Sequence, residues 1–208
     1  RLSRSAFGKV PLSVREQHRY LDTQLSEMRR QLDNAKGGHG LTVKRLEGAL
    51  ARAEERLKKL TDGAKDPGIT FEETGIDYLM VDEAHAYKNL RTVSNIQGVG
   101  IEGSQRASDL DMKLDYLRER PGGRVATFAT ATPIANSVSE AFTMQRFLRP
   151  DLLDAAGLTD FDTWAATFGE VTIDLELAPD GSRFRMQSRF AKFRNVPELL
   201  RMWHVSAD

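Results

Sequence analysis

The sequence predicts an α/β protein whose core is a parallel sheet covered by helices, with a helical hairpin before it and a small β-hairpin after it. Two short apolar runs, at 78–81 and 124–128, each lead into a polar turn and are separated by a helical pattern. Strands and helices that alternate in this way are typical of parallel α/β layers. Residues 12–62 show two amphipathic helical patterns, and 171–187 alternate in polarity around a Pro-Asp-Gly turn.

Composition narrows the class of protein. The 208 residues include 30 basic and 30 acidic side chains, so any contact with nucleic acid must come from local patches. There are no cysteines, which excludes disulfides and thiolate metal sites. No apolar run approaches membrane-spanning length, and the first residues lack the hydrophobic core of a signal peptide. We therefore expect a soluble, cytoplasmic protein without a membrane partner.

The two ends of the chain suggest a piece of a longer polypeptide. The sequence starts with Arg1 rather than methionine and stops at Asp208, directly after an amphipathic segment. The N-terminal segment, residues 1–11, contains Gly8-Lys9, but no GxxxxGK[ST] phosphate loop occurs in the sequence.

Residues 12–62 predict an antiparallel helical hairpin. Ser13 and Glu16 have the spacing of a capping box at the start of the first helix, and the second helix ends near Asp62-Gly63. A glycine-rich turn at 34–40 separates two sets of apolar residues at helical spacing, so each helix can bury the stripe of the other. The sets are Leu21, Leu25, Met28 and Leu32, and then Leu46, Leu50, Ala53, Leu57 and Leu60.

Basic side chains flank both apolar stripes of this hairpin. They could follow the phosphates of a nucleic acid, or they could form a solvated face. Interleaved acidic residues favour the solvated face. The basic residues are Arg15, Arg19, Arg29, Arg30, Lys44, Arg45, Arg52, Arg56, Lys58 and Lys59.

Residues 63–150 are predicted to form the α/β part. The apolar run at 78–81 suits a strand that is buried on both faces of a sheet. The polar segment 87–103 has no periodicity, and a loop of this length is usually functional or mobile. Ser108 with Asp111 then suits the start of a helix.

The second strand, at 124–128, leads into a turn of small and hydroxyl residues at 129–137. A helical pattern resumes through 140–148, and Pro150 marks its end. Residues 151–208 are then predicted to form an extension of short helices and a β-hairpin.

Aromatic residues in this extension are interpreted as core. Phe161, Trp164 and Phe168 recur at three- and four-residue spacing, which suits a helix core better than a ligand cage.

The tail of the chain has two interpretations. Basic residues alternate there with aromatic ones, so the tail could bind nucleic acid through charge and stacking. It could equally be an amphipathic helix that Asn195 caps, with Pro197 in its first turn.

Asp82 and Glu83 follow the strand at 78–81 directly. In parallel sheets, ligands bind beyond the carboxyl ends of the strands. Two neighbouring carboxylates there can divide the work of a nucleotide hydrolase, because one can hold a hard cation such as Mg²⁺ while the other polarises a water. A surface Asp-Glu pair without function is the simpler interpretation of these two residues alone.

Longer strings around the carboxylates resemble a known family. Asp82-Glu83-Ala84-His85, followed by Lys88-Asn89, resembles the Walker B (DEAH) motif of superfamily 2 helicases in the form used by Swi/Snf-type DNA translocases. Thr130-Ala131-Thr132-Pro133, followed by Ile134, Asn136, Ser137 and Glu140, resembles motif III of the same enzymes. The resemblance implies part of a RecA-like sheet of the P-loop NTPase type, with ATP and Mg²⁺ as cofactors and double-stranded DNA as partner.

Most of residues 74–208 also resembles the helicase portion of large proteins of phages, plasmids and integrative elements. In these proteins a DNA adenine methyltransferase region is joined to a superfamily 2 helicase, which implies such a region in the same polypeptide. The strings that carry this resemblance are Gly157-Leu158, Phe161-Asp162-Thr163-Trp164-Ala165, Thr167-Phe168-Gly169-Glu170, Glu176-Leu177-Ala178-Pro179, Arg189-Phe190-Ala191-Lys192-Phe193 and Pro197-Glu198-Leu199-Leu200.

The resemblance also implies roles for single residues. Asp82 would hold Mg²⁺, Glu83 would orient or deprotonate the attacking water, and His85 would link the nucleotide site to motif III. The hydroxyls of Thr130 and Thr132 would hydrogen-bond the carboxylates, so that a change at the phosphate alters the packing of the lobe. Candidate contacts to DNA are Lys88, Arg189, Lys192 and Arg194.

The chain departs from the family in lacking the Walker A loop and the second RecA-like lobe with its arginine finger. Phosphoryl transfer depends on a phosphate cradle and on charge clamps around the metal. We therefore expect an ATP-dependent helicase or translocase motor only in the full-length protein, and an inactive chain in isolation. One alternative is a DNA- or protein-binding module that uses the basic hairpin and the basic, aromatic tail. A coiled-coil adaptor is disfavoured by the long non-helical half of the chain.

Overall fold

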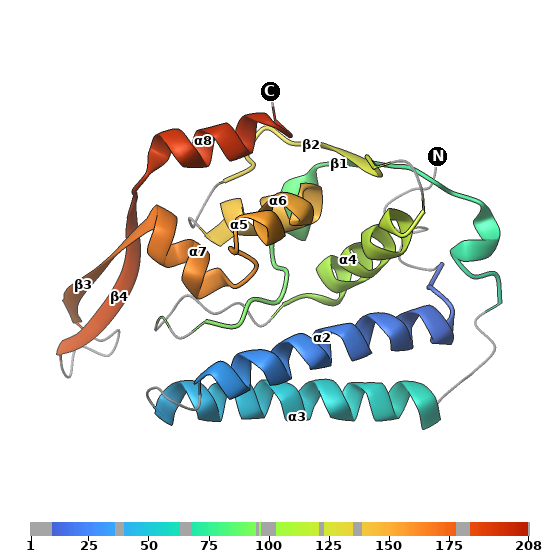
Figure 1. Ribbon diagram of the computed structural model, residues 1–208, viewed down its shortest axis with the longest axis horizontal. Coiled ribbons are helices and arrows are strands. Elements are labelled where there is room, and N and C mark those ends of the chain that lie inside the picture. Colours follow the sequence, from blue (N-terminus) through green and yellow to red (C-terminus); the bar gives the residue numbers. More distant parts are fainter. Residues whose placement is uncertain are drawn as a thin grey trace. The chain divides into compact units, whose positions relative to one another are not determined.

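The computed structural model describes residues 10–35, 40–62, 68–94, 96, 103–120, 123–134, 139–177 and 184–207 (Figure 1). Helices combine with short strands, which confirms the predicted α/β class. The chain divides into two compact units, Arg1–Met80 with Gln105–Thr127 and Val81–Ser104 with Phe128–Asp208. The domain boundaries predicted from the sequence, after residues 11, 62 and 150, differ from this division and stay predictions.

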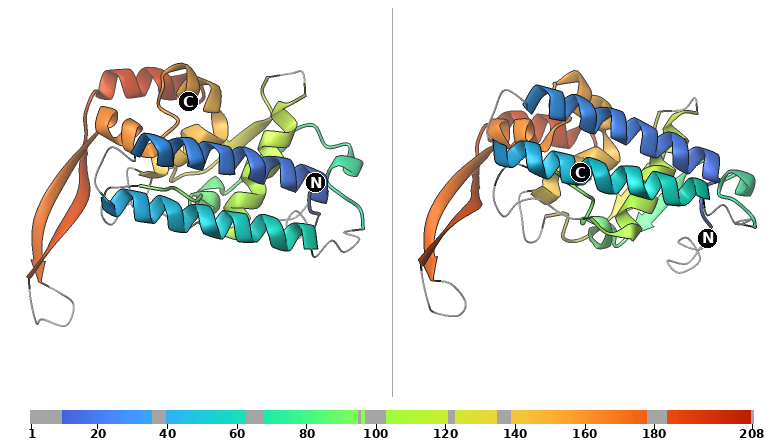
Figure 2. Two further views of the ribbon diagram at one scale, coloured as in Figure 1. Left: turned by 60° about the horizontal axis from the view of Figure 1, so that its bottom comes forward. Right: turned by 90° about the horizontal axis from the view of Figure 1, so that it is seen from below.

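The first unit contains the expected helical hairpin, as α2 (Val14–Ala35) and α3 (Gly40–Asp62). The two helices lie side by side and antiparallel in Figures 1 and 2. Leu25, Met28 and Ala53 are buried together between them. Each helix therefore covers the apolar stripe of the other, as the spacing predicts.

Helix α2 begins with half of the predicted capping box. The Ser13 hydroxyl accepts the Glu16 N–H at 3.3 Å. The reciprocal bond comes from a distant residue, because the Ser13 N–H donates to both Glu72 carboxylate oxygens, at 3.0 and 3.1 Å. Glu72 begins the short helix η1 (Glu72–Thr74), so the segment after the hairpin fastens the start of α2.

Polar contacts join α2 to α4 (Gln105–Arg118). The Tyr20 hydroxyl donates a hydrogen bond to Asp111 Oδ2, although Asp111 is only 7% exposed. Arg19 pairs with Asp115 at 3.1 Å, and its guanidinium also contacts Glu119. The hairpin is thus attached to α4 through hydroxyl and charged groups.

The predicted start of this helix is wrong. α4 begins at Gln105 rather than at Ser108, so Asp111 lies in the second turn and contacts Tyr20 instead of helping to start the helix. The reason is Gly103, which has a left-handed φ of 87° and turns the chain directly before the helix. A Cβ at Gly103 would lie 2.8 Å from the Cβ of Arg91, so only glycine fits there.

A second charged group of α4 is also buried. Lys113 Nζ lies 2.7 Å from Asp109 Oδ2 and 5.5 Å from the centre of the Phe71 ring, and the lysine is fully buried. Burial lowers the pKa of Lys113 and raises the pKa of Asp109, while the bond between them opposes both shifts. The buried residues of α4 therefore include charged as well as apolar side chains. An amphipathic sequence pattern does not reveal buried charged residues.

Strands β1 (Leu79–Asp82) and β2 (Ala126–Ala129) pair in a small parallel sheet. The prediction that the first strand is buried on both faces is wrong, because Leu79 is 7% exposed and Met80 is 83% exposed. Neighbouring side chains of a strand point to opposite faces. In the part of the chain that the structure describes, the face that carries Met80 is open. The RecA-like form of the sheet stays a prediction.

The second unit is built around aromatic side chains from α5 (Ser139–Leu148) and α7 (Phe161–Phe168), with α6 (Pro150–Ala155) between these helices in sequence. Trp164 is fully buried, and its Nε1 donates to Gln145 Oε1 at 2.8 Å. Phe161 and Phe168 are both 2% exposed, which confirms that these aromatics are core.

An antiparallel hairpin of β3 (Gly169–Leu177) and β4 (Phe184–Phe193) follows, with a register shift after Glu170. It extends away from the helices of this unit (Figure 2). The Pro-Asp-Gly turn expected to connect the strands lies outside the described residues. α8 (Val196–His204) then begins beside Asn195, as the helical interpretation of the tail predicts.

Asn195 does not cap α8 with its side chain. Its Nδ2 donates instead to the Thr167 carbonyl at 2.8 Å, which ties the start of α8 to α7. No helix in the described ranges is long and apolar enough to cross a lipid bilayer.

The attachment of the hairpin to α4 can be tested by replacing Tyr20. We expect Tyr20→Phe to lower the free energy of unfolding by about 1–3 kcal/mol, because the buried Asp111 carboxylate loses a donor. Thr23→Ala removes a hydroxyl from the exposed side of α2 and should change the free energy by less than about 0.5 kcal/mol. Urea denaturation followed by circular dichroism measures both. Equal effects of the two substitutions would contradict the role given to Tyr20.

Candidate functional site

The candidate site starts where β1 ends. Asp82 is the last residue of the strand, and Glu83 follows with a left-handed φ of 54°. Glu83 and Asn195 are the non-glycine residues with positive φ among those that the structure describes. Such a conformation costs roughly 1–2 kcal/mol, and it persists where surrounding contacts hold it. The backbone is therefore strained at the second carboxylate of the motif.

Contacts on both sides fix this turn. The Glu83 N–H donates to Asp82 Oδ1 at 2.9 Å, and the Glu83 carbonyl accepts the Ala86 N–H at 2.9 Å. The short helix η2 (Ala84–Tyr87) follows, with Ala84 fully buried and Tyr87 5% exposed. Between these two buried residues, the side chain of His85 is 40% exposed.

His85 connects Glu83 to the segment after β2. Its Nδ1 lies 3.1 Å from Thr130 Oγ1 and 3.1 Å from Glu83 Oε2. A carboxylate only accepts hydrogen bonds, so the contact with Glu83 is a hydrogen bond in the tautomer, or in the charged form, that carries a hydrogen on Nδ1. Thr130 Oγ1 also accepts the Thr132 N–H at 3.2 Å, which holds the hydroxyl in place.

The threonines do not contact the carboxylates in the way the sequence predicts. We expected the hydroxyls of Thr130 and Thr132 to bond Asp82 and Glu83, but Thr130 reaches Glu83 through the imidazole of His85. Thr132 is exposed, and its backbone N–H donates to the Thr130 hydroxyl. The imidazole of His85 therefore lies between the hydroxyl and the carboxylate.

The half-buried Lys88 and the buried Glu140 form an ion pair beside this turn. Lys88 Nζ lies 2.8 Å from Glu140 Oε1, with side chains that are 19% and 5% exposed. The sequence predicts Lys88 as a DNA contact, and this stays a prediction; the structure shows its ammonium group paired with Glu140. Glu140 belongs to the motif III resemblance but had no predicted role, because nothing in the sequence shows which partner it meets.

The predicted basic tail is only partly described at the level of side chains. Lys192 and Arg194 are exposed, and one Arg194 nitrogen donates to the Ala166 carbonyl at 3.2 Å. Arg189 pairs with Thr172 in the backbone register of the β-hairpin, and its side chain lies outside the described set. Two of the three predicted tail cations are therefore shown at the surface.

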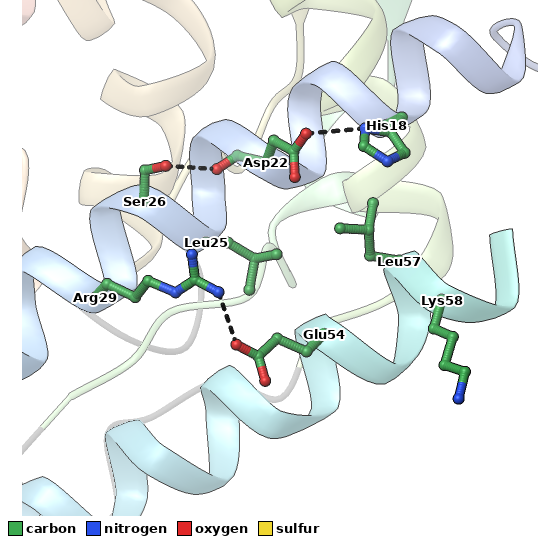
Figure 3. A pocket seen from close by; sticks show the side chains of 8 residues that line it. All are labelled: His18, Asp22, Leu25, Ser26, Arg29, Glu54, Leu57 and Lys58. Carbon is green, nitrogen blue, oxygen red and sulfur yellow. Dashed lines mark hydrogen bonds and ion pairs between the residues drawn. The ribbon is translucent and has the colours of Figure 1, made fainter. Parts of the chain in front are cut away.

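The hairpin offers a groove rather than a basic face. A cavity of about 390 Å³ lies between α2 and α3, lined by residues of both charges (Figure 3). Along it, His18 Nδ1 lies 2.9 Å from Asp22 Oδ2, and Arg29 bonds Glu54 at 2.9 Å. This pairing of charges agrees with a solvated face and weakens the case for phosphate tracking.

The residues present fit a magnesium ion that is shared with a phosphate group. The described residues contain no cluster of three or more potential metal ligands. Mg²⁺ usually takes one or two protein carboxylates and completes its shell with water and substrate phosphates. Asp82 offers an exposed carboxylate at the strand end, beside the exposed Glu83, which matches this need.

Comparison with known proteins identifies the family. A model described as "Probable helicase domain" matches residues 1–208. The chain belongs to this helicase domain family.

This helicase domain is also similar to a phage protein. It is 30% identical over 110 residues to the Defense against restriction protein B of Escherichia phage P1. The match covers 50% of this chain and 5% of the phage protein, so the domain corresponds to a small part of that relative. No solved structure matches the chain.

The strain at Glu83 can be tested with two substitutions that both remove the carboxylate. We expect Glu83→Gly to be more stable than Glu83→Ala by about 1 kcal/mol, because glycine adopts positive φ without a steric cost. At Glu73, whose φ is not positive, the order should reverse. Thermal and urea unfolding measure both pairs. An alanine variant at position 83 that equals the glycine variant would contradict a left-handed Glu83.

Proposed function

We propose that this helicase domain is part of the ATP-dependent motor of a superfamily 2 DNA helicase or translocase of the Swi/Snf type. In this proposal the domain supplies the Walker B carboxylates and motif III of a RecA-like lobe. The observation that carries the proposal is the contact of His85 with both Glu83 and Thr130, because it joins the two motifs in one hydrogen-bonded unit. The family match to a helicase domain supports the same conclusion.

The two carboxylates have different surroundings and therefore different tasks. Asp82 Oδ1 accepts the N–H of Glu83, so this carboxylate is oriented by the backbone and suits the Mg²⁺ of a bound nucleotide. When bound, Mg²⁺ neutralises charge on the phosphate oxygens. Glu83 lies on the strained turn with its side chain 56% exposed, where its carboxylate can orient a water molecule and accept its proton.

His85 has a positioning task in this account. Its Nδ1–H holds one Glu83 oxygen, so the carboxylate cannot rotate freely when it acts on water. The same nitrogen contacts Thr130, so a shift of the Glu83 side chain alters the contact with the segment after β2. This arrangement gives a physical route from the phosphate site to the start of α5.

We further propose that the motor is complete only in a longer polypeptide. A phosphate loop and a second lobe would supply the phosphate cradle and the arginine finger, and the phage relative is far longer than this chain. The open sheet face at Met80, which is 83% exposed, is a surface that such segments would cover. A methyltransferase region in the same polypeptide and a cytoplasmic location belong to this proposal.

The proposal predicts the effect of Glu83→Gln on ATP hydrolysis. In a polypeptide that adds the phosphate loop and second lobe, we expect DNA-stimulated hydrolysis to fall by about 10²–10⁴-fold, because glutamine cannot accept a proton. The 208-residue chain alone should show no hydrolysis above background. A phosphate-release assay measures both. Turnover by the isolated chain that disappears in Glu83→Gln would contradict the expected inactivity.

A second candidate function is a nucleic-acid-binding module. The exposed Lys192 and Arg194, close to the end of β4 and the start of α8, favour this function for the tail. The hairpin is less suited to it, because Arg19 and Arg29 are paired with carboxylates. Duplex DNA is the partner that both candidate functions share.

Charge reversal distinguishes the tail from the hairpin as the DNA contact. We expect Lys192→Glu with Arg194→Glu to weaken binding of duplex DNA and to reduce the slope of log affinity against log salt by about 2, or roughly 0.9 per lost phosphate contact. Arg52→Glu with Arg56→Glu on the exposed side of α3 is the matched control and should change the slope little. Fluorescence anisotropy at several salt concentrations measures both. A loss confined to the hairpin variant would favour the hairpin as the binding surface.

A further inference from the structure

The ion pair of Lys88 and Glu140 has no task in the chemistry described above. Both residues belong to the second unit, and their side chains are 19% and 5% exposed. Removing charges from water is unfavourable, and this cost is recovered only when the geometry of the pair is favourable. A distance of 2.8 Å between Nζ and Oε1 meets that condition.

The pair acts on the turn that carries Glu83 and His85. Lys88 directly follows η2, and its backbone N–H donates to the His85 carbonyl at 3.3 Å. Glu140 lies in the first turn of α5. Like Thr130, it belongs to the part of the chain that follows β2. Lys88 is therefore bonded to His85 through its backbone and to α5 through its side chain.

Two ties thus connect the turn after β1 to the chain after β2. The His85–Thr130 tie is partly exposed and uses the nitrogen that also contacts Glu83. The Lys88–Glu140 tie is charge-assisted and less exposed, and both properties strengthen a hydrogen bond. A turn with a left-handed Glu83 needs such external contacts to keep its conformation.

We propose that Lys88 and Glu140 are positioning residues, which hold the Glu83 carboxylate and the His85 imidazole at the geometry that water activation and its coupling to α5 require. The proposal rests on the proposed function in so far as Glu83 acts on water. The geometric part of the proposal, that the ion pair fixes the conformation of the turn, does not depend on the function of Glu83. Neither side chain contacts the nucleotide, since both act through the backbone of η2 and the start of α5.

The alternative is that the pair only stabilises the fold, and an apolar replacement separates the two roles. Buried ion pairs can often be replaced by apolar residues of similar volume without loss of stability. Lys88→Met with Glu140→Leu should therefore fold but lack the directional bond. Lys88→Glu with Glu140→Lys exchanges the charges and restores such a bond in the opposite direction.

The test has one arm on the 208-residue chain and one on the polypeptide that hydrolyses ATP. On the chain, NMR spectra report the backbone amides of 83–86 and the His85 ring. In the longer polypeptide, we expect the apolar pair to lower kcat by about tenfold to a hundredfold with little change in KM, as for a small misplacement of a reacting group. The exchanged pair should recover most of the kcat and the His85 signals of the wild type.

Ser94→Ala provides the control, because Ser94 is buried in the same unit and its hydroxyl bonds Asp162 at 2.5 Å. It should lower the melting temperature and leave the His85 signals and kcat unchanged. If the exchanged pair does not fold, Glu140→Gln replaces it, since the amide keeps an acceptor for Lys88. The kcat of Glu140→Gln should then lie between those of the wild type and the apolar pair.

Three results would overturn the proposal. The first is an apolar pair with wild-type kcat and wild-type His85 signals. The second is a folded exchange variant, or Glu140→Gln, with no more activity than the apolar pair. The third is an unchanged NMR spectrum at 83–86 in every variant. If instead Glu83→Gln leaves hydrolysis intact, the proposed function fails, and the NMR arm still decides whether the ion pair sets the turn.

Discussion

The position of His85 Nδ1 between Glu83 and Thr130 is the arrangement on which the candidate site depends. It joins the residue after β1 to the residue after β2, at 3.1 Å on each side. Thr130 Oγ1 and Glu83 Oε2 share this one nitrogen, so a shift of His85 toward either oxygen changes its contact with the other.

The strain at Glu83 and the contacts around it are consistent with a site that is held ready for a substrate. Left-handed residues other than glycine persist where other interactions over-determine the backbone. Here those interactions are the buried Ala84, the bond to Asp82 and the tie of Lys88 to α5. These contacts keep the two neighbouring carboxylates of Asp82 and Glu83 exposed at the end of β1.

The sequence predicts the elements of this domain better than their contacts. Periodicity is a local property, so the hairpin helices and the aromatic core around Trp164 follow from it directly. The open face at Met80 does not, because an apolar strand looks the same whether one or both faces are covered. The buried bond of Asp111 to Tyr20 and the Lys88–Glu140 pair were missed for a related reason: their partners lie far away in the sequence. The motif resemblance located His85 and Thr130, but the bond that joins them required the structure.

The central claim is that Asp82 and Glu83 form the metal-and-nucleotide end of the sheet. Paramagnetic relaxation by Mn²⁺, added with ATP to the isotope-labelled chain, tests it most directly. The account predicts that the amide signals of Asp82, Glu83 and His85 broaden first, and that Asp82→Asn removes this effect. Broadening that instead centres on the groove between α2 and α3, or that is unchanged in Asp82→Asn, would contradict the account.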